Sequence, residues 1–204
     1  MKKINLMNIL SLLFLLLFIN VTLVWSQIIF YSGVKCGINH FSVSTAGTSM
    51  QASGGGYTTG IKIEMYEIKS RLGLNLDLLY EFERTTGNYW WDFSEHKVIR
   101  IPLLANIAVF DSEKLTIMFG IGNEIYYILE SRVVFNNHEF QEEKRREGKS
   151  ENFFLIGAKS LIKISSKIRL SLEARLGRNS TANTISNTAI LESLQFLIGV
   201  DYKL

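Results

Sequence analysis

The sequence predicts an all-β protein, an eight-stranded antiparallel up-and-down β-barrel that spans a membrane. Three observations support this fold class. Apolar residues recur at every second position over eight stretches of the chain, which is the side-chain period of a β-strand. Long and short connections alternate between the stretches, as they do in barrels with loops on one side of a membrane and turns on the other. The second face of the stretches carries charges of both signs, which the dry core of a β-sandwich cannot hold.

The N-terminus resembles an export signal. Two lysines precede an almost purely apolar segment at residues 9–19, and residues 24–26 provide a cleavage site. A retained membrane helix is the alternative, but the apolar stretch covers about 17 residues, fewer than the roughly 20 that a helix needs to span a bilayer. We therefore expect residues 1–26 to be a cleaved signal peptide and residues 27–204 to form the barrel domain.

Composition and charge exclude several other classes of protein. Of the 204 residues, 47% are apolar and 20% are charged, a balance typical of a folded domain and not of a disordered chain. Cys36 is the only cysteine, which excludes an internal disulfide and a cysteine-based zinc cluster. Without residues 1–26 the chain keeps 20 basic and 19 acidic residues, a net charge of +1, so no nucleic-acid partner is expected.

The first four strands are predicted at residues 28–41, 56–67, 72–82 and 98–110. The third is the most regular, and its apolar face consists of Leu72, Leu74, Leu76, Leu78, Tyr80 and Phe82. A helix would spread these side chains around its whole surface, so the period must be two. A Ser/Thr/Gly-rich loop follows the first strand, and a short turn near residues 68–70 follows the second. A polar loop follows the third, and its Trp90 and Trp91 fit an interfacial anchor as well as a ligand contact.

The remaining strands are predicted at residues 115–129, 152–164, 167–177 and 194–204. Short turns at residues 111–114 and 165–166 alternate with a long charged loop at about residues 130–151 and with an Asn/Thr/Ser-rich loop. The last strand alternates without a break from Leu194 to Leu204. An even number of strands places both ends of the barrel on the side of the short turns.

The polar faces of the predicted strands gather charged residues of both signs: Lys62, Glu64, Asp77, Glu81, Arg100, Glu124, Lys159, Lys163, Arg169, Glu173 and Arg175. Eight strands enclose an interior that side chains just fill. Opposite charges confined there should pair, because an unpaired buried charge is costly. The sequence therefore predicts a charge network that plugs the lumen, so that the barrel is not an open channel.

Aromatic residues near the strand ends predict two girdles at the membrane interfaces. The loop-side set is Tyr57, Tyr80, Phe82, Phe153 and Phe154, and the turn-side set is Phe30, Tyr31, Tyr66, Phe110 and Tyr202. A soluble lipocalin-like ligand-binding barrel is the alternative, with the apolar faces inside and the polar faces outside. Broad apolar faces and glycines on the charged faces favour the membrane barrel.

Five segments carry a family resemblance: Gly33-Val-Lys-Cys-Gly-Ile-Asn39, residues 74–80, Ile99-Arg-Ile-Pro-Leu-Leu104, Phe119-Gly-Ile-Gly122 and Gly199-Val-Asp-Tyr-Lys-Leu204. With these segments the chain resembles the small outer-membrane β-barrels of Gram-negative bacteria, in particular the PorT-like family. Gly199, Tyr202 and Leu204 are similar to the assembly signal of such barrels, whose known members often end on Phe or Trp. The resemblance implies residence in the cell outer membrane, with outer-membrane lipids and the barrel assembly machinery as partners. For some members it also implies a role in protein export.

Catalytic and metal-binding candidates are few. His40, His96 and His138 lie at strand ends or in loops without the spacing of metal ligands, so neither a metal nor a cofactor is expected. His40 and Ser42 share one strand face, and lipid-deacylating barrels use a similar His-x-Ser pair with a nearby acid. No such acid is identifiable, so a lipid-modifying enzyme is the alternative to a structural, binding or protein-export accessory barrel. The charged run at residues 142–147 is expected to be a solvated loop tip or a contact surface for a protein partner.

Overall fold

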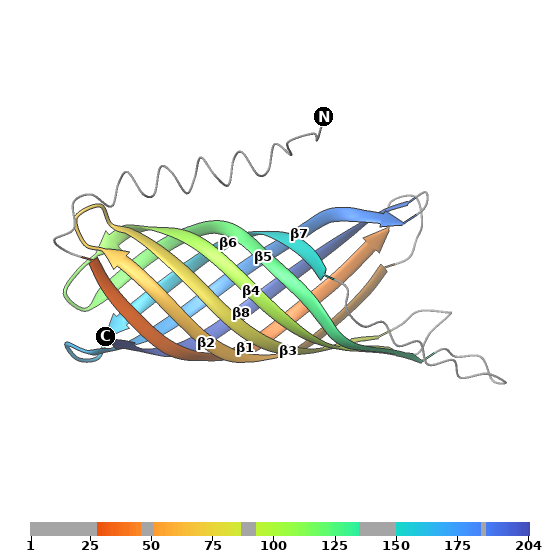
Figure 1. The fold of residues 1–204 in the computed structure, drawn as a ribbon, viewed down its shortest axis with the longest axis horizontal. Coiled ribbons are helices and arrows are strands. Elements are labelled where there is room, and N and C mark those ends of the chain that lie inside the picture. Colours follow the sequence, from red (N-terminus) through yellow and green to blue (C-terminus); the bar gives the residue numbers. More distant parts are fainter. Residues whose placement is uncertain (1–27, 46–50, 87–92, 135–149, 185–186) are drawn as a thin grey trace, which may run out of the picture.

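A computed structural model describes residues 28–45, 51–86, 93–134, 150–184 and 187–204. Within these residues eight antiparallel strands form one closed barrel, in which each strand pairs with its neighbours in sequence and β1 pairs with β8 (Figure 1). The strands are β1 (Ile28–Thr45), β2 (Gln51–Glu67), β3 (Leu72–Thr86), β4 (Phe93–Asp111), β5 (Leu115–Val134), β6 (Ser150–Lys163), β7 (Ile168–Thr184) and β8 (Asn187–Lys203). The predicted fold class is confirmed. In the described part of the chain, no helix is long and apolar enough to cross a membrane.

Several strands extend farther toward the long connections than predicted. β3 continues to Thr86 and β5 to Val134, and β4 already begins at Phe93. The apolar alternation ends where contact with lipid ends, but antiparallel backbone pairing continues beyond it as a polar wall. As a result Glu83 and His96, which the sequence assigned to a loop or its edge, pair across β3 and β4.

Short turns close the barrel at the end where β1 begins and where the C-terminus lies (Figure 1). In the β2–β3 turn, the Ser70 hydroxyl donates to Glu67 Oε2 at 2.6 Å, and Arg71 adopts a positive φ of 57°. In the β4–β5 turn, the Ser112 backbone N–H donates to the Leu115 carbonyl at 2.9 Å. The short turns therefore share one end of the barrel, and the long connections share the other.

The two faces of the barrel wall have opposite polarity. Ile61 and Leu76 face outward and are 55% and 47% exposed, while their strand neighbours Lys62 and Asp77 face inward and are each 1% exposed. Exposed apolar side chains continue around all eight described strands, so the surface matches the hydrocarbon of a bilayer. The soluble lipocalin-like alternative requires the reverse arrangement.

Inward-facing glycines allow neighbouring strands to approach each other closely. At Gly56 and Gly122, an added Cβ atom would collide with the carbonyl oxygens of Phe82 and Leu103, respectively. A side chain at either position would push the paired strands apart. Glycine is therefore needed where the wall curves tightly.

The predicted aromatic girdles are wrong in part. Tyr66 and Phe153 face the lumen and are buried, and the Tyr31 ring lies against the Arg169 guanidinium, with 3.5 Å from Cζ to the ring centroid. The exposed members of the two sets are Phe30, Tyr57, Tyr80, Phe110, Phe154 and Tyr202. Whether an aromatic side chain faces the lipid or the lumen is decided by its position in the strand alternation, and not by its aromatic character. The predicted signal peptide, Trp90, Trp91, His138 and the run at residues 142–147 lie outside the described residues.

Candidate functional site

The lumen is the most distinctive chemical feature of the barrel. Alternate strand positions direct charged side chains inward, where they are almost completely buried. We divide the described ones into a turn-side, a central and a loop-side group, according to their position along the strands. Two apolar clusters bracket these groups: Tyr66, Ala108, Met118 and Leu161 toward the turns, and Phe41, Val98, Leu104, Tyr126, Phe153 and Leu155 toward the loops.

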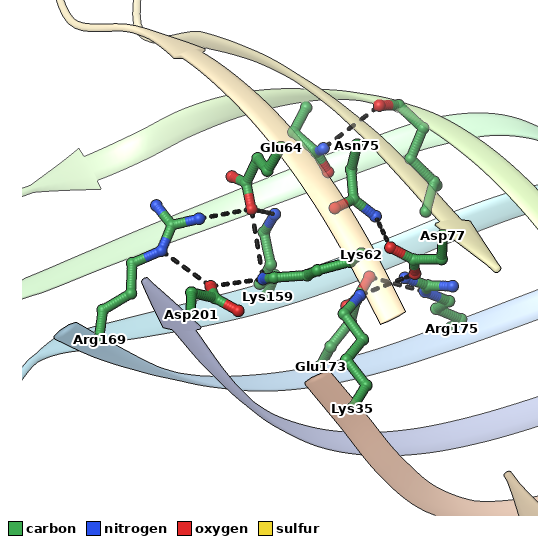
Figure 2. Close-up of polar contacts among 12 residues, drawn as sticks. Lys35, Lys62, Glu64, Asn75, Asp77, Lys159, Arg169, Glu173, Arg175 and Asp201 are labelled. Carbon is green, nitrogen blue, oxygen red and sulfur yellow. Dashed lines mark hydrogen bonds and ion pairs between the residues drawn. The ribbon is translucent and has the colours of Figure 1, made fainter. Parts of the chain in front are cut away.

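The turn-side group consists of Lys62, Glu64, Lys159, Arg169 and Asp201, which come from four strands (Figure 2). Glu64 Oε2 lies 2.6 Å from Arg169 Nη2, 3.0 Å from Lys159 Nζ and 3.4 Å from Lys62 Nζ. Asp201 Oδ2 lies 2.5 Å from Lys62 Nζ and 2.8 Å from Arg169 Nε. Two carboxylates thus hold three cations together across the lumen.

The central group consists of Lys35, Asn75, Asp77, Glu173 and Arg175 (Figure 2). Lys35 Nζ lies 2.8 Å from Asp77 Oδ2 and 2.6 Å from Glu173 Oε2. Arg175 pairs with the same two carboxylates, through Nε to Glu173 Oε1 at 2.7 Å and through Nη2 to Asp77. Asn75 Nδ2 donates to Asp77 Oδ1 at 2.8 Å. Two cations and two anions balance here.

The loop-side group is built around one cation, Arg100. Its Nη2 lies 2.8 Å from Glu81 Oε1 and 2.7 Å from Glu83 Oε1, and its Nη1 lies 2.6 Å from Glu124 Oε1. The guanidinium also faces the Tyr126 ring, with Cζ 4.8 Å from the ring centroid. Three buried carboxylates share a single guanidinium, so this group carries an excess of acid.

The three loop-side carboxylates differ in how many hydrogen bonds they accept. Glu81 pairs with Arg100 and accepts hydrogen bonds from three neutral donors: Asn39, Thr58 at 2.5 Å and Gln195 at 2.8 Å. Glu83 accepts from Arg100, from the Tyr126 hydroxyl at 2.8 Å and from Asn39 at 3.3 Å. Glu124 accepts from Arg100 through Oε1, while its Oε2 has no hydrogen-bond partner among the described residues. Glu124 is therefore the least compensated carboxylate.

Buried charged and apolar side chains line this lumen together. Only the central group balances its charges internally, because the turn-side group has one cation more than it has carboxylates and the loop-side group has an excess of acid, and the two apolar clusters lie inside the barrel with these groups. Among the residues described, no cluster of His, Cys, Asp or Glu has the arrangement of a metal site. The network ties together strands that are distant in sequence, as Lys35 and Glu173 illustrate.

The charged residues that lie in the lumen differ in part from the predicted set. Lys163 lies at the turn-side rim, with its side chain 41% exposed and its Nζ 3.8 Å from Asp111 Oδ1. The β6 strand ends at this residue, so its side chain reaches water instead of the other charges. The other predicted members lie inside: Lys62, Glu64, Asp77, Glu81, Arg100, Glu124, Lys159, Arg169, Glu173 and Arg175. Lys35, Glu83 and Asp201 also lie inside. Alternation already places Lys35 and Asp201 on the polar faces of their predicted strands, whereas Glu83 lies where the apolar half of the pattern has stopped.

His40 and Ser42 lie on the outer face of β1 near its loop end. In the β1–β8 register Ser42 pairs with Glu192, so a carboxylate is present on the neighbouring strand. Glu192 Oε1 lies 3.7 Å from Arg178 Nε. Within the described part of the chain, no hydrogen bond joins these three residues into a triad. The structure therefore brings His40, Ser42 and Glu192 to one face without connecting them.

The residues of the predicted assembly signal lie at the turn end of β8. Tyr202 and Leu204 face outward and are 47% and 71% exposed. Gly199 faces inward, where an added Cβ atom would meet the Ser171 hydroxyl at 2.7 Å. The Leu204 backbone N–H donates to the Phe30 carbonyl at 3.0 Å, so pairing between the last and first strands continues to this residue.

A closed barrel, an apolar exterior and a buried polar interior define a transmembrane β-barrel of the outer-membrane class. No protein-family model and no curated protein matches the chain. Among solved structures, Neisserial surface protein A (NspA) is similar, with a TM-score of 0.55 and 14% identity over 86% of this chain and 97% of that one.

Two further solved structures show a weaker likeness. Ail, the attachment invasion locus protein of Yersinia pestis, aligns with a TM-score of 0.48 and 10% identity over 86% of this chain and 99% of that one. The outer membrane protease OmpT from Escherichia coli aligns with a TM-score of 0.43 and 8% identity over 86% and 97%. At such identities, the likeness to NspA shows the fold alone.

Proposed function

We propose that this protein is a non-channel outer-membrane barrel, a rigid scaffold that functions through its outer loops or its lipid face. The observation that carries the proposal is the paired lumen. Arg100 and Glu81 are both fully buried and in direct contact, and the central group closes the lumen below them. Side chains that fill an eight-stranded lumen and pair with each other leave little room for a continuous path of water and ions.

Reconstitution into planar bilayers tests the plugged lumen. The purified barrel is expected to give no stable single-channel conductance under conditions where an open porin, reconstituted in parallel, conducts. Steady, large conductance from the folded protein would overturn the proposal and assign the barrel to transport. Folding is checked in the same sample by comparing gel migration with and without boiling.

Within this class we propose a PorT-like role as a structural, binding or protein-export accessory component. The proposal rests on the resemblance of Ile99-Arg-Ile-Pro-Leu-Leu104 and the C-terminal segment to that family. A partner would bind through the loops, and the barrel assembly machinery would recognise Gly199, Tyr202 and Leu204. Deletion of the gene in its native host is expected to lower the amount of exported protein in the medium. Unchanged export with intact membranes would contradict the export role.

A second candidate function, hydrolysis of acyl esters in outer-membrane lipids, is favoured by one observation. Glu192 pairs in register with Ser42, on the face where His40 also lies. In such a site Ser42 Oγ attacks the ester carbonyl, His40 takes the hydroxyl proton and returns it to the leaving alcohol, and Glu192 orients the imidazole. Water then releases the acyl group from Ser42.

Acyl release from lipid vesicles tests this second candidate. Ser42→Ala is expected to abolish release, whereas Ser32→Ala, on the same β1 strand near the turns, leaves release unchanged. An active-site fluorophosphonate should label the wild type and the Ser32→Ala variant only. Absence of both labelling and release in the folded wild-type barrel rules this function out.

A further inference from the structure

An asparagine lies on the lipid-facing side of β5. Eight outward positions of this strand run from Leu115 to Leu129, and Asn123 is the fifth of them. Its register neighbours on the adjoining strands are Leu103 and Phe154, which are 46% and 51% exposed. The amide of Asn123 thus lies between apolar side chains on the lipid face of the barrel, on the loop side of the strand midpoint.

The Asn123 side chain is exposed and forms no hydrogen bond with any of the described residues. Thr59, another polar residue on the lipid face, differs, because its hydroxyl donates to the Lys35 carbonyl at 3.3 Å. An amide that faces hydrocarbon without a partner is unfavourable, since acyl chains offer neither donors nor acceptors. The position therefore requires a polar partner from outside the barrel.

A shallow, mostly apolar hollow lies over β5, β6 and β7, and its lining includes Phe119, two outward positions before Asn123 on β5. Two outward alanines on neighbouring strands, Ala158 of β6 and Ala174 of β7, lie at its floor, and larger side chains such as Phe119, Ile156 and Leu176 surround them. Its volume is about 420 Å³. Small residues on a lipid face allow a second membrane segment to pack closely.

We propose that two copies of this chain pair in the membrane through the β5–β6 face, with Asn123 of one copy hydrogen-bonded to Asn123 of the other. An amide group carries both donors and an acceptor, so the same side chain is its own complement across a two-fold axis. That axis turns the β4 side of one barrel, with the exposed Leu103 and Ile107, toward the β6 side of the other. A lipid acyl chain fills the hollow but leaves the amide unsatisfied, which is why a second copy is the occupant.

Cross-linking in lipid vesicles tests the pairing, with a control that the chain already contains. Cys36 is exposed on β1, which is four strands away from β5 in either direction around the barrel. A bifunctional thiol reagent is expected to dimerise Ile125→Cys in a Cys36→Ser background, where Asn123 is intact. The wild type, with Cys36 alone, is expected to stay monomeric under the same reagent.

Asn123→Leu then distinguishes the contribution of the amide from nonspecific association of the apolar faces. In the Ile125→Cys background, Asn123→Leu is expected to lower the dimer association constant about tenfold, because a hydrogen-bonded polar pair within a membrane strengthens association by roughly that factor. Asn123→Gln is expected to retain dimerisation, because it keeps the amide. Sedimentation equilibrium in detergent gives the same constants without cross-linking. A monomeric protein, equal cross-linking at both cysteines, or dimers unaffected by Asn123→Leu would each overturn the proposal. These outcomes are independent of the lumen, so they leave the non-channel function untouched.

Discussion

Removing the loop-side cation should be the most damaging single change in the barrel. Arg100 is fully buried and contacts Glu81, Glu83 and Glu124 at 2.6 to 2.8 Å. Arg100→Met keeps a long side chain but leaves three carboxylates without a cation. Breaking a buried ion pair by removing one partner costs about 3–5 kcal/mol, and three uncompensated acids place this variant at the upper end of that range.

The measurement is equilibrium unfolding by denaturant in lipid vesicles, followed by tryptophan fluorescence and by gel migration without boiling. Lys97→Met is the matched control, since Lys97 lies on the same strand and pairs with Glu130 at 2.7 Å, but at the exposed rim. No measurable loss of unfolding free energy is expected for Lys97→Met. If the free energy of unfolding of Arg100→Met lies within about 1 kcal/mol of the wild-type value, the three carboxylates are hydrated. The argument for a dry, plugged lumen would then fail.

Two further predictions test the faces and the acid excess. Leu76→Arg, at mid-depth on the lipid face, should cost about 2–4 kcal/mol of unfolding free energy, whereas Ile164→Arg, at the turn rim, should cost about 0–1 kcal/mol; equal costs would show that Leu76 does not face hydrocarbon. Glu81→Gln should destabilise the barrel, because Glu81 accepts three hydrogen bonds and forms an ion pair with Arg100, while Glu124→Gln should be neutral or stabilising, because Glu124 Oε2 accepts none from the described residues. The reverse order in the same unfolding assay contradicts this account of the loop-side group.

The fold class was readable from the sequence because it depends on a local rule. Side chains alternate between faces at every residue of a strand, so the apolar run from Leu72 to Phe82 already separates lipid face from lumen. The same rule identified most of the inward charges. It failed at strand ends: Glu83 was assigned to a loop because the apolar half of the pattern stops at the lipid boundary, although backbone pairing continues.

The sequence did not determine which charges meet, and only the closed tertiary structure decided this. Lys35 reaches Glu173 across a separation of 138 residues, and Arg169 reaches Glu64 across 105. Such contacts depend on the register of all eight strand pairs and on closure between β1 and β8. No local pattern encodes the accumulated register around a barrel. The sequence by itself therefore determined that the lumen holds charge, and the closed barrel decided how that charge is neutralised.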